Sequence, residues 1–284
     1  MFTKKEIATY YNHTLLHYRV GWQLDKSKGL HYGLWYPDTK NLHEAIQNTN
    51  KKIGSFIKNK DGFDVLDAGC GVGGSAIFLA QNYHCNVHGI TLSKAQLDQG
   101  NKYLEKTEVR KQVQLSVQDY SQTSFDNESF DLVFGIESFC HSDDKSETYK
   151  EAYRLLRPGG QLVIIDSIKT AKGSRPENRK TLEWLFHRWA ISDLDDGHET
   201  VKNLKDAGFD GIDIENLTTN ARKSINIIYR RAFWGLITIP LYWLVYQNKY
   251  GFTRRHPESG WALHKCFRNN LLEYVCISAT KPTL

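Results

Sequence analysis

Asp67 and the glycines that follow it form the stretch of this sequence with the clearest chemical potential. The aspartate ends a short apolar run, and Gly69, Gly71 and Gly74 then satisfy the spacing G-x-G-x-x-G at the start of an apolar, helix-like segment. That spacing is typical of a dinucleotide site, where a pyrophosphate lies at the helix N-terminus. A carboxylate beside that position disfavours a pyrophosphate but attracts a cofactor with ammonium and sulfonium charges. Glycines let such a cofactor approach the backbone closely.

The end of the next apolar run gives a second test, because nicotinamide enzymes place an acid there to bind the ribose hydroxyls. In "NVHGITLSKAQ" that position is Thr91, with Ser93 and Gln96 following. These neutral groups can still hydrogen-bond a ribose. A nicotinamide oxidoreductase therefore becomes the weaker hypothesis. A tight strand-to-helix turn without any ligand is the purely structural alternative.

Glu137 and His141 are the candidates for acid–base chemistry. They lie in "GIESFCHSDDK", and their spacing of four places them on one face if the segment forms a helical turn. The preceding apolar run should end at the carboxyl edge of the sheet, where open α/β folds bind ligands. A carboxylate there can stabilise a carbocation and then remove a proton, and either residue can deprotonate a phenol. An ion-pair or capping role for Glu137 and an indirect hydrogen-bonding role for His141 are the alternatives.

Aromatic rings can stabilise a positively charged transition state, and two regions of the chain are rich in them. Near the N-terminus the candidates are Tyr11, Tyr18, His31 and Tyr32. The second region is the apolar stretch 232–246, flanked by arginines, where Trp234 and Tyr242 are candidates for the acceptor pocket. Its aromatic spacing fits no single helical face. The stretch is therefore predicted as a core helix or as a lid over an apolar acceptor.

From residue 63 onward, short apolar runs alternate with amphipathic stretches, which predicts βα units on a parallel sheet. Helices are predicted over 74–81, 93–106 and 145–156, the last ended by "RPGG". Seven strands are predicted, over 63–67, 85–90, 113–117, 130–135, 161–166, 211–216 and 273–279. We expect an α/β fold with a seven-stranded, doubly wound Rossmann-like sheet. Its parts are a helical cap at 1–60, a core at 61–216, an inserted apolar lid at 217–270 and a final strand at 271–284.

Composition narrows the class of protein and its partners. The net charge of +5 comes from scattered basic residues, so nucleic acid is not implied, while an anionic substrate or a membrane surface fits. Five cysteines without a C-x-x-C argue against a disulfide framework and a thiolate zinc site, and no metal is predicted. The N-terminus lacks a signal peptide, and the 15 residues of 232–246 are shorter than the about 20 that span a bilayer. We expect a cytoplasmic protein, with peripheral membrane contact left open.

Several of these motifs, taken together, resemble those of one enzyme family. "VLDAGCGVGG", "GITLSKAQ", "SFDLVFGIES" and "AYRLLRPGGQLVI" resemble, in order, the core motifs of class I S-adenosylmethionine-dependent methyltransferases. The branch with the most similar motifs contains the sterol C-methyltransferases, tocopherol methyltransferases and cyclopropane-fatty-acid synthases. The resemblance covers about residues 60 to 170.

The resemblance implies a role for each matching position. The methionine part of the cofactor would lie against Asp67, Gly69 and Gly71, the ribose against Thr91, Leu92 and Gln96, and the adenine near Asp119 and Tyr120. Cys70 and Glu137 are also implied to belong to the cofactor site. Glu137, His141, Tyr18 and His31 would serve catalysis, and Tyr11, Tyr32, Trp234 and Tyr242 would line the acceptor pocket.

The implied function is methyl transfer from S-adenosylmethionine to a small hydrophobic acceptor of the sterol, prenyl or quinol type, at carbon. N- or O-methylation of a natural product, cyclopropane formation on a lipid, and a non-catalytic cofactor-binding module are the alternatives. The acceptor and the oligomeric state, a homodimer included, stay open at this point.

Overall fold

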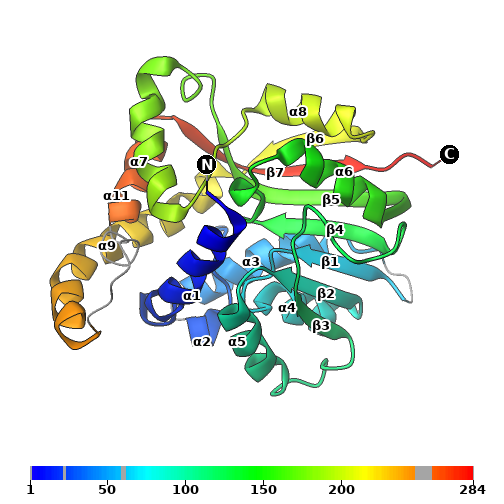
Figure 1. The fold of residues 1–284 in the computed structure, drawn as a ribbon, viewed down its shortest axis with the longest axis horizontal. Coiled ribbons are helices and arrows are strands. Elements are labelled where there is room, and N and C mark those ends of the chain that lie inside the picture. The colour runs from blue at the N-terminus through cyan, green and yellow to red at the C-terminus, as the bar shows by residue number, and fades with distance from the viewer. Residues whose placement is uncertain (1, 22–23, 59–61, 247–257, 284) are drawn as a thin grey trace.

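The computed structural model describes residues 2–21, 24–58, 62–246 and 258–283, with only the backbone described at 16–17, 20–21 and 235–246. A seven-stranded sheet lies at its centre, in the order β3-β2-β1-β4-β5-β7-β6 (Figure 1). The strands are β1 (Asp64–Ala68), β2 (Asn86–Thr91), β3 (Val113–Val117), β4 (Phe130–Ile136), β5 (Leu156–Lys169), β6 (Asp210–Asn216) and β7 (Leu272–Thr280). The α/β class and all seven predicted strands are confirmed.

The sheet is mixed rather than wholly parallel, which corrects the sequence prediction. β1 to β5 pair in parallel, but β7 runs antiparallel to both β5 and β6. Leu272, the first residue of β7, pairs with Lys169, the last residue of β5. The long connection after β6 therefore returns the chain to the carboxyl edge that it left, so the next strand must run the opposite way.

Helices surround the sheet, and those that the sequence predicted are present within a few residues. They are α4 (Gly74–Tyr83), α5 (Lys94–Leu104) and α6 (Lys145–Leu155). β5 begins at Leu156, so "RPGG" lies inside that strand. The other helical elements are α1 (Lys4–Gly21), α2 (Leu24–Ser27), α3 (Leu42–Gly54), η1 (Phe139–His141), η2 (Pro176–Asn178), α7 (Arg179–Trp189), α8 (Gly197–Asp206), α9 (Thr218–Tyr246) and α11 (Glu258–Arg268). The sequence reading missed α7 and α8.

Alternate side chains of the strands pack into two separate cores, one on each face of the sheet. In β5, Val163 and Ile165 join the core that also holds residues of α4, α7, α9 and α11. Leu162 and Ile164 join the opposite core, with α6 and α8. Figure 1 shows α7, α9 and α11 together beside the carboxyl ends of the parallel strands, with α1 in front of those ends. Helices from distant parts of the chain thus converge where the sequence predicts the site.

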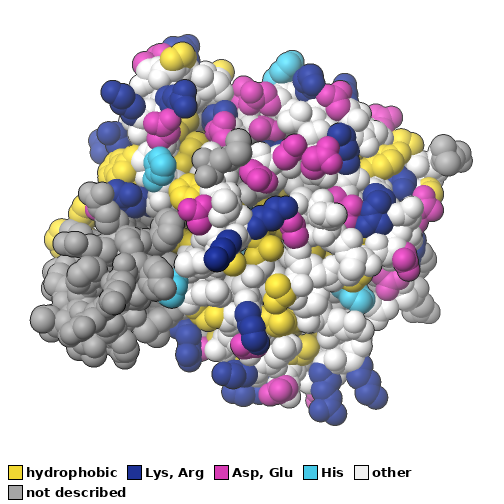
Figure 2. Space-filling model, viewed as in Figure 1, with side chains coloured by type: hydrophobic (Ala, Val, Ile, Leu, Met, Phe, Trp, Pro, Cys, Tyr) yellow, Lys and Arg dark blue, Asp and Glu magenta, His cyan; other side chains and the backbone are white. Residues whose placement is uncertain are grey.

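At the opposite, amino edge of the sheet, ion pairs connect three neighbouring strands. Arg157 donates to Asp64 at 2.8 Å and to Asp131 at 2.6 Å, which joins β5 to β1 and β4. Elsewhere on the face shown in Figure 2, basic and acidic side chains are interspersed rather than gathered. The arrangement agrees with the scattered charges of the sequence.

Gly74, the first residue of α4, provides a test of how the N-terminal segment packs on the core. A Cβ there would lie 1.9 Å from the carbonyl oxygen of Lys28. We expect Gly74→Ala to lower the free energy of unfolding by about 1–3 kcal/mol, because the backbone must move apart. Gly197→Ala is the matched control, since it also begins a helix but its Cβ would meet atoms only at 3.8 Å and beyond. Equal losses for both variants in chemical denaturation would contradict this packing.

Candidate active site

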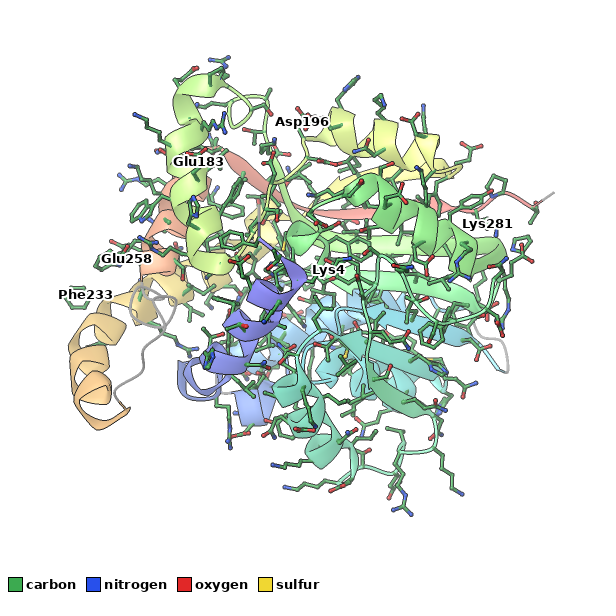
Figure 3. The ribbon with its side chains drawn as sticks, viewed as in Figure 1. Lys4, Glu183, Asp196, Phe233, Glu258 and Lys281 are labelled. Atoms are coloured by element: carbon green, nitrogen blue, oxygen red, sulfur yellow. The ribbon has the colours of Figure 1, made fainter. Side chains whose placement is uncertain are left out.

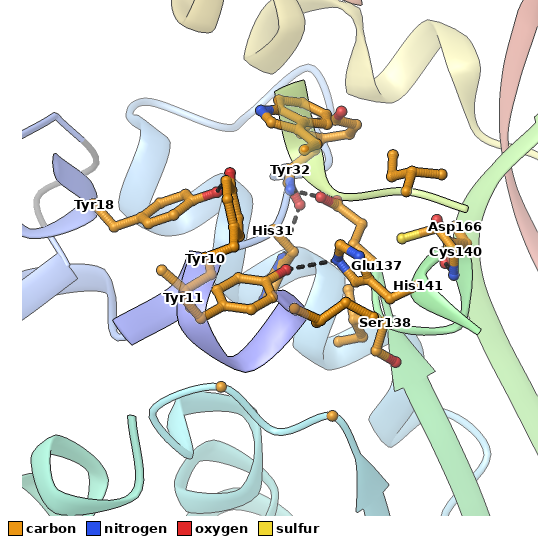
Figure 4. Close-up of a pocket in the computed structure, with 18 of the residues that line it drawn as sticks. Tyr10, Tyr11, Tyr18, His31, Tyr32, Glu137, Ser138, Cys140, His141 and Asp166 are labelled. Carbon is orange, nitrogen blue, oxygen red and sulfur yellow. Dashed lines mark hydrogen bonds between the residues drawn. The ribbon is translucent and has the colours of Figure 1, made fainter. Parts of the chain in front are cut away.

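A cavity of about 660 Å³ opens at the carboxyl ends of β1, β2, β4 and β5. Its walls also come from α1, the segment 28–32, α7, α9 and α11. Figure 4 shows labelled residues of α1, of the segment 28–32, of the segment after β4 and of β5 converging on the cavity. Of the residues that the sequence proposed, the cavity is lined by Tyr11, Tyr18, His31, Tyr32, Asp67, Gly69, Cys70, Gly71, Thr91, Leu92, Gln96, Tyr120, Glu137, His141 and Trp234.

Asp67 is a buried residue with one carboxyl oxygen that makes no hydrogen bond. It lies near the end of β1, is 2% exposed, and its Oδ2 has no hydrogen-bond partner. Burial raises the pKa of the Asp67 carboxyl to about 8, against a smaller opposite effect of the Ala76 amide. The carboxyl is therefore largely protonated near pH 7, and a cation brought into the cavity would stabilise its ionised form. The residue therefore fits the ammonium group of a cationic cofactor.

The glycine loop after β1 adopts a backbone that side chains would not tolerate. The φ values are +99° at Gly69, +54° at Gly71 and +74° at Gly73, all in the region that favours glycine. A Cβ on Gly69 would lie 2.4 Å from the Cβ of Ser138. The loop is held by Ile90, whose carbonyl accepts from the amides of Gly69 and Cys70. Its backbone thus borders the cavity without side-chain bulk.

Polar side chains at the end of β2 lie beside this loop. The Thr91 hydroxyl donates to Oε1 of Gln96 at 2.7 Å, and Ser93 caps α5 by accepting from the Gln96 amide. Ser93 also donates to Asn12 at 2.6 Å. That bond ties α1 to the start of α5. The neutral groups expected around a ribose are therefore ordered and buried.

Glu137 is the most constrained of the predicted catalytic residues. It follows β4 with φ of +50°, and its Oε1 accepts from the Tyr32 amide at 2.7 Å and from the Tyr274 hydroxyl at 2.8 Å. Burial raises the pKa of Glu137 to about 8, although both hydrogen bonds oppose the shift. The expectation that Glu137 and His141 share a helical face is wrong, since only Phe139–His141 forms a helical turn. The two side chains nevertheless line the same cavity.

His141 is paired with Tyr11 rather than with Glu137. Its Nδ1 lies 3.0 Å from the Ala190 carbonyl oxygen, so that nitrogen carries the proton and donates. Nε2 then accepts from the Tyr11 hydroxyl at 2.7 Å. Burial lowers the pKa of His141 to about 4, so the ring is neutral near pH 7. The dashed line between Tyr11 and His141 in Figure 4 therefore joins a phenol donor to a neutral imidazole.

The remaining N-terminal candidates shape the cavity in different ways. Tyr18 contacts Tyr10 through their hydroxyls at 3.2 Å, and burial raises the pKa of Tyr18 to about 12. The Nδ1 atom of His31 lies 2.9 Å from the Tyr32 carbonyl and donates to it, while burial lowers the pKa of His31 to about 4. Both side chains are therefore uncharged near pH 7 and line the cavity.

Two proposed residues are placed differently. Asp119 does not line the cavity, because its carboxylate pairs with Lys4 and accepts from Ser121, and Gln118 lines the cavity instead. The side chain of Tyr242 lies outside the described residues. The roles assigned to both stay predictions.

Sequence reasoning also missed several lining residues. Asp166 at the carboxyl end of β5 lines the cavity, and its two oxygens accept from the amides of Cys140 and Ser167. α7 contributes Leu185 and Trp189. The spacing of Leu182, Leu185, Phe186 and Trp189 follows a helical face and could have predicted α7.

Two kinds of feature are absent from the described part of the chain. Residues 2–21, 24–58, 62–246 and 258–283 contain no group of three or more histidine, cysteine, aspartate or glutamate residues placed to bind a metal ion. Within the same ranges, no helix is long and apolar enough to cross a membrane.

Relatives with assigned activities cover most of this chain. It is 27% identical to the O-methyltransferase resE of Aspergillus sclerotiorum, over 72% of this chain and 76% of that protein. It is 29% identical to the sterol 24-C-methyltransferase ERG6 of Saccharomyces cerevisiae, over 75% of this chain and 55% of that protein. The chain thus spans little more than half the length of the sterol enzyme.

Solved structures share the fold over nearly the whole chain. The geranyl diphosphate C-methyltransferase of Streptomyces coelicolor A3(2) has a TM-score of 0.76 at 20% identity, covering 98% of this chain and 97% of that one. The cyclase SpnF has a TM-score of 0.79 at 20% identity, covering 99% and 97%. Since a cyclase shares it, the fold alone does not define the reaction.

The family assignment comes from the sequence. Residues 4–231 match the family described as mycolic acid cyclopropane synthetase. That range contains the glycine loop, Glu137 and His141. The chain therefore belongs to this family and is a class I S-adenosylmethionine-dependent methyltransferase of the branch that includes the sterol C-methyltransferases.

Proposed function

We propose that the protein methylates a small hydrophobic acceptor of the sterol, prenyl or quinol type, with carbon as the methylated atom. The observation that carries the proposal is Glu137, a partly buried carboxylate held by two hydrogen bonds in a cavity lined by tyrosines. Methyl transfer to an alkene carbon creates a positive charge and leaves a proton to be removed, and a carboxylate can serve both needs. The sterol relatives act at carbon by name, which agrees with this choice.

Asp67, Gly69, Cys70 and Gly71 are the residues proposed to hold the methionine part of S-adenosylmethionine. The orphaned Oδ2 of Asp67 would bind the ammonium group, and the glycine backbone would leave room beside it. Thr91, Leu92 and Gln96 would hold the ribose and Tyr120 the adenine. When bound, the cofactor supplies an electrophilic methyl group on a positively charged sulfur.

The protein's own residues would then orient the acceptor and remove the proton that it loses. Ionised Glu137 would face the positive charge that develops on the acceptor and accept the proton that leaves it. Tyr11 donates its own proton to His141, so its oxygen is free to accept a hydrogen bond from an acceptor hydroxyl. The faces of Tyr11, Tyr18 and Tyr32 would add cation–π stabilisation.

Apolar side chains would exclude water from this reaction. Leu185 and Trp189 of α7, Ile228 of α9 and Leu263 of α11 line the cavity. Water exclusion strengthens the interaction of Glu137 with a developing charge and protects a carbocation from hydrolysis. The same surface suits an acceptor that is itself largely apolar.

An apolar acceptor would reach the cavity past α9. Trp234 lines the cavity and is 66% exposed, and the neighbouring Phe233 is 58% exposed and points away from the body of the protein in Figure 3. α9 carries four basic residues and no acidic one. We propose that this part of α9 contacts an anionic membrane surface from the cytoplasmic side, so that the acceptor passes directly from the bilayer.

Cofactor affinity should depend on pH through Asp67. Because a bound cation favours the ionised carboxylate, binding below the pKa of about 8 must release a proton. Affinity should therefore rise between about pH 6 and pH 7.5, by at most roughly tenfold per pH unit. We expect Asp67→Asn to weaken binding roughly tenfold or more and to flatten this dependence in calorimetric titrations.

Two variants serve as controls for the Asp67 titration. Asp98→Asn makes the same chemical change on the exposed face of α5 and should bind the cofactor normally. Glu137→Gln separates the contribution of the second carboxyl in the cavity with a raised pKa. Unchanged affinity of Asp67→Asn would remove Asp67 from the proposed site.

Glu137→Gln should separate catalysis from cofactor binding. We expect turnover to fall by roughly 100-fold or more, with cofactor affinity at pH 9 changed little, because the proton acceptor is lost. The measurement is transfer of labelled methyl from S-adenosylmethionine to a panel of sterols, prenyl compounds, quinols and amines, with products located by mass spectrometry. A full-rate variant would refute the role of Glu137. Label on nitrogen or oxygen alone would refute methylation at carbon.

Membrane contact is tested with vesicles. We expect the protein to sediment with phosphatidylcholine vesicles that contain phosphatidylserine, and less with phosphatidylcholine alone or at high salt. Replacing Phe233 and Trp234 together by serine should abolish sedimentation. Val117→Ser, which removes an exposed apolar side chain from β3, is the control. Sedimentation of the double variant equal to that of the natural protein would refute this contact.

A further inference from the structure

Tyr274 of β7 reaches the catalytic carboxylate from a strand that does not border β4. The residue is fully buried and is not among those that line the cavity. Its hydroxyl donates to Oε1 of Glu137 at 2.8 Å, across a sequence separation of 137 residues. The contact therefore depends on β4, β5 and β7 being assembled side by side.

The strand register explains how the contact forms. Tyr274 pairs with Ser167 of β5, and the sheet order places β5 between β7 and β4. The amide of Glu137 donates to the Ile165 carbonyl of β5 at 2.8 Å. β5 therefore fixes the backbone of Glu137, while the Tyr274 side chain extends past β5 to fix the carboxylate.

A second donor meets the same oxygen atom. The Tyr32 amide donates to Oε1 at 2.7 Å, and the rings of Tyr32 and Tyr274 lie 5.1 Å apart between centroids. Both bonds end on Oε1, so Oε2 takes part in neither. Hydrogen bonds that end on an ionised carboxylate stabilise that form and fix its direction.

We propose that Tyr274 is a positioning residue for methyl transfer. By holding Oε1 of Glu137 it leaves Oε2 to face the acceptor, and it favours the ionised carboxylate in a setting where burial opposes it. The proposal rests on the catalytic role of Glu137 argued above. Tyr274 itself touches neither cofactor nor acceptor in this scheme.

Other titratable groups face Glu137 and must be distinguished from it. These groups are the partly buried Tyr11 and Tyr18 of α1 and the buried Tyr32, Tyr274 and Cys140. Removal from water raises the pKa of each, so they stay neutral near pH 8. Asp166 of β5 also faces it, and burial raises the pKa of Asp166 to about 6. Its charge in turn contributes to the raised pKa of Glu137. Asp166 should therefore titrate below Glu137.

The titration of Glu137 can be read without any acceptor. Glutamate labelled with carbon-13 at Cδ in the full chain reports each carboxyl by NMR, and Glu137→Gln identifies the signal. We expect Tyr274→Phe to raise the pKa of Glu137 by about one pH unit, because one of two donors to the ionised form is lost. Tyr149→Phe is the matched control, since Tyr149 is also buried but belongs to the other core. An unshifted signal in folded Tyr274→Phe would overturn the proposal.

A second variant keeps the proposal testable if Tyr274→Phe does not fold. 3-Fluorotyrosine introduced at position 274 alone keeps the hydroxyl but makes it a stronger donor. The pKa of Glu137 should then fall rather than rise, and an unchanged pKa would overturn the proposal. Because both titrations need neither cofactor nor acceptor, they stand even if no methyl acceptor is found. Once an acceptor is known, the acid limb of kcat in Tyr274→Phe should move to higher pH with KM for the cofactor unchanged.

Discussion

The structure depends on the removal from water of two carboxyl groups, the buried Asp67 and the partly buried Glu137, at the carboxyl ends of β1 and β4, which are neighbours in the sheet. Taking an ionised carboxylate out of water is costly unless a cation or hydrogen-bond donors replace the lost solvation. The two groups meet this constraint in different ways. Glu137 receives donors from the protein, whereas Oδ2 of Asp67 receives none. The contrast agrees with the two proposed roles: Glu137 is already positioned to act on the acceptor, whereas Asp67 gains its partner only when the cationic cofactor binds.

Several of the contacts that attach the N-terminal segment to the core are made in the site itself. Asn12 contacts the cap of α5, Tyr11 donates to His141, and the Tyr32 amide donates to Glu137. Each bond ends on a residue that lines the cavity or on the cap beside it. The segment therefore closes the cavity and completes the hydrogen bonding of its polar groups at the same time. Loss of these contacts would open the site and leave buried polar atoms without partners, so closure and catalytic geometry are coupled.

The sequence predicted the sheet well, because strands buried on both faces read as continuous apolar runs. It also predicted a set of site residues most of which line the cavity, since positions at the ends of parallel strands meet at one edge. It could not predict the partners of those residues. Tyr274 contacts Glu137 only because β7 inserts antiparallel beside β5, and Tyr11 pairs with His141 only because α1 lies over the edge. Both are tertiary contacts without a local signal. α7 is a different case, as its apolar spacing was present but not recognised.

The antiparallel final strand β7 can place a side chain against a catalytic residue from the side that faces away from the cavity. Residues at the carboxyl ends of β1, β2, β4 and β5 face the cavity and can meet ligands directly. β7 begins at that same edge but runs away from it, so its first residues lie beside the site while the strand itself is buried. A long side chain there can reach a catalytic group from the protein side without occupying the space of the acceptor. The hydroxyl of Tyr274 occupies that position, which allows the protonation of Glu137 to be set independently of the shape of the acceptor cavity.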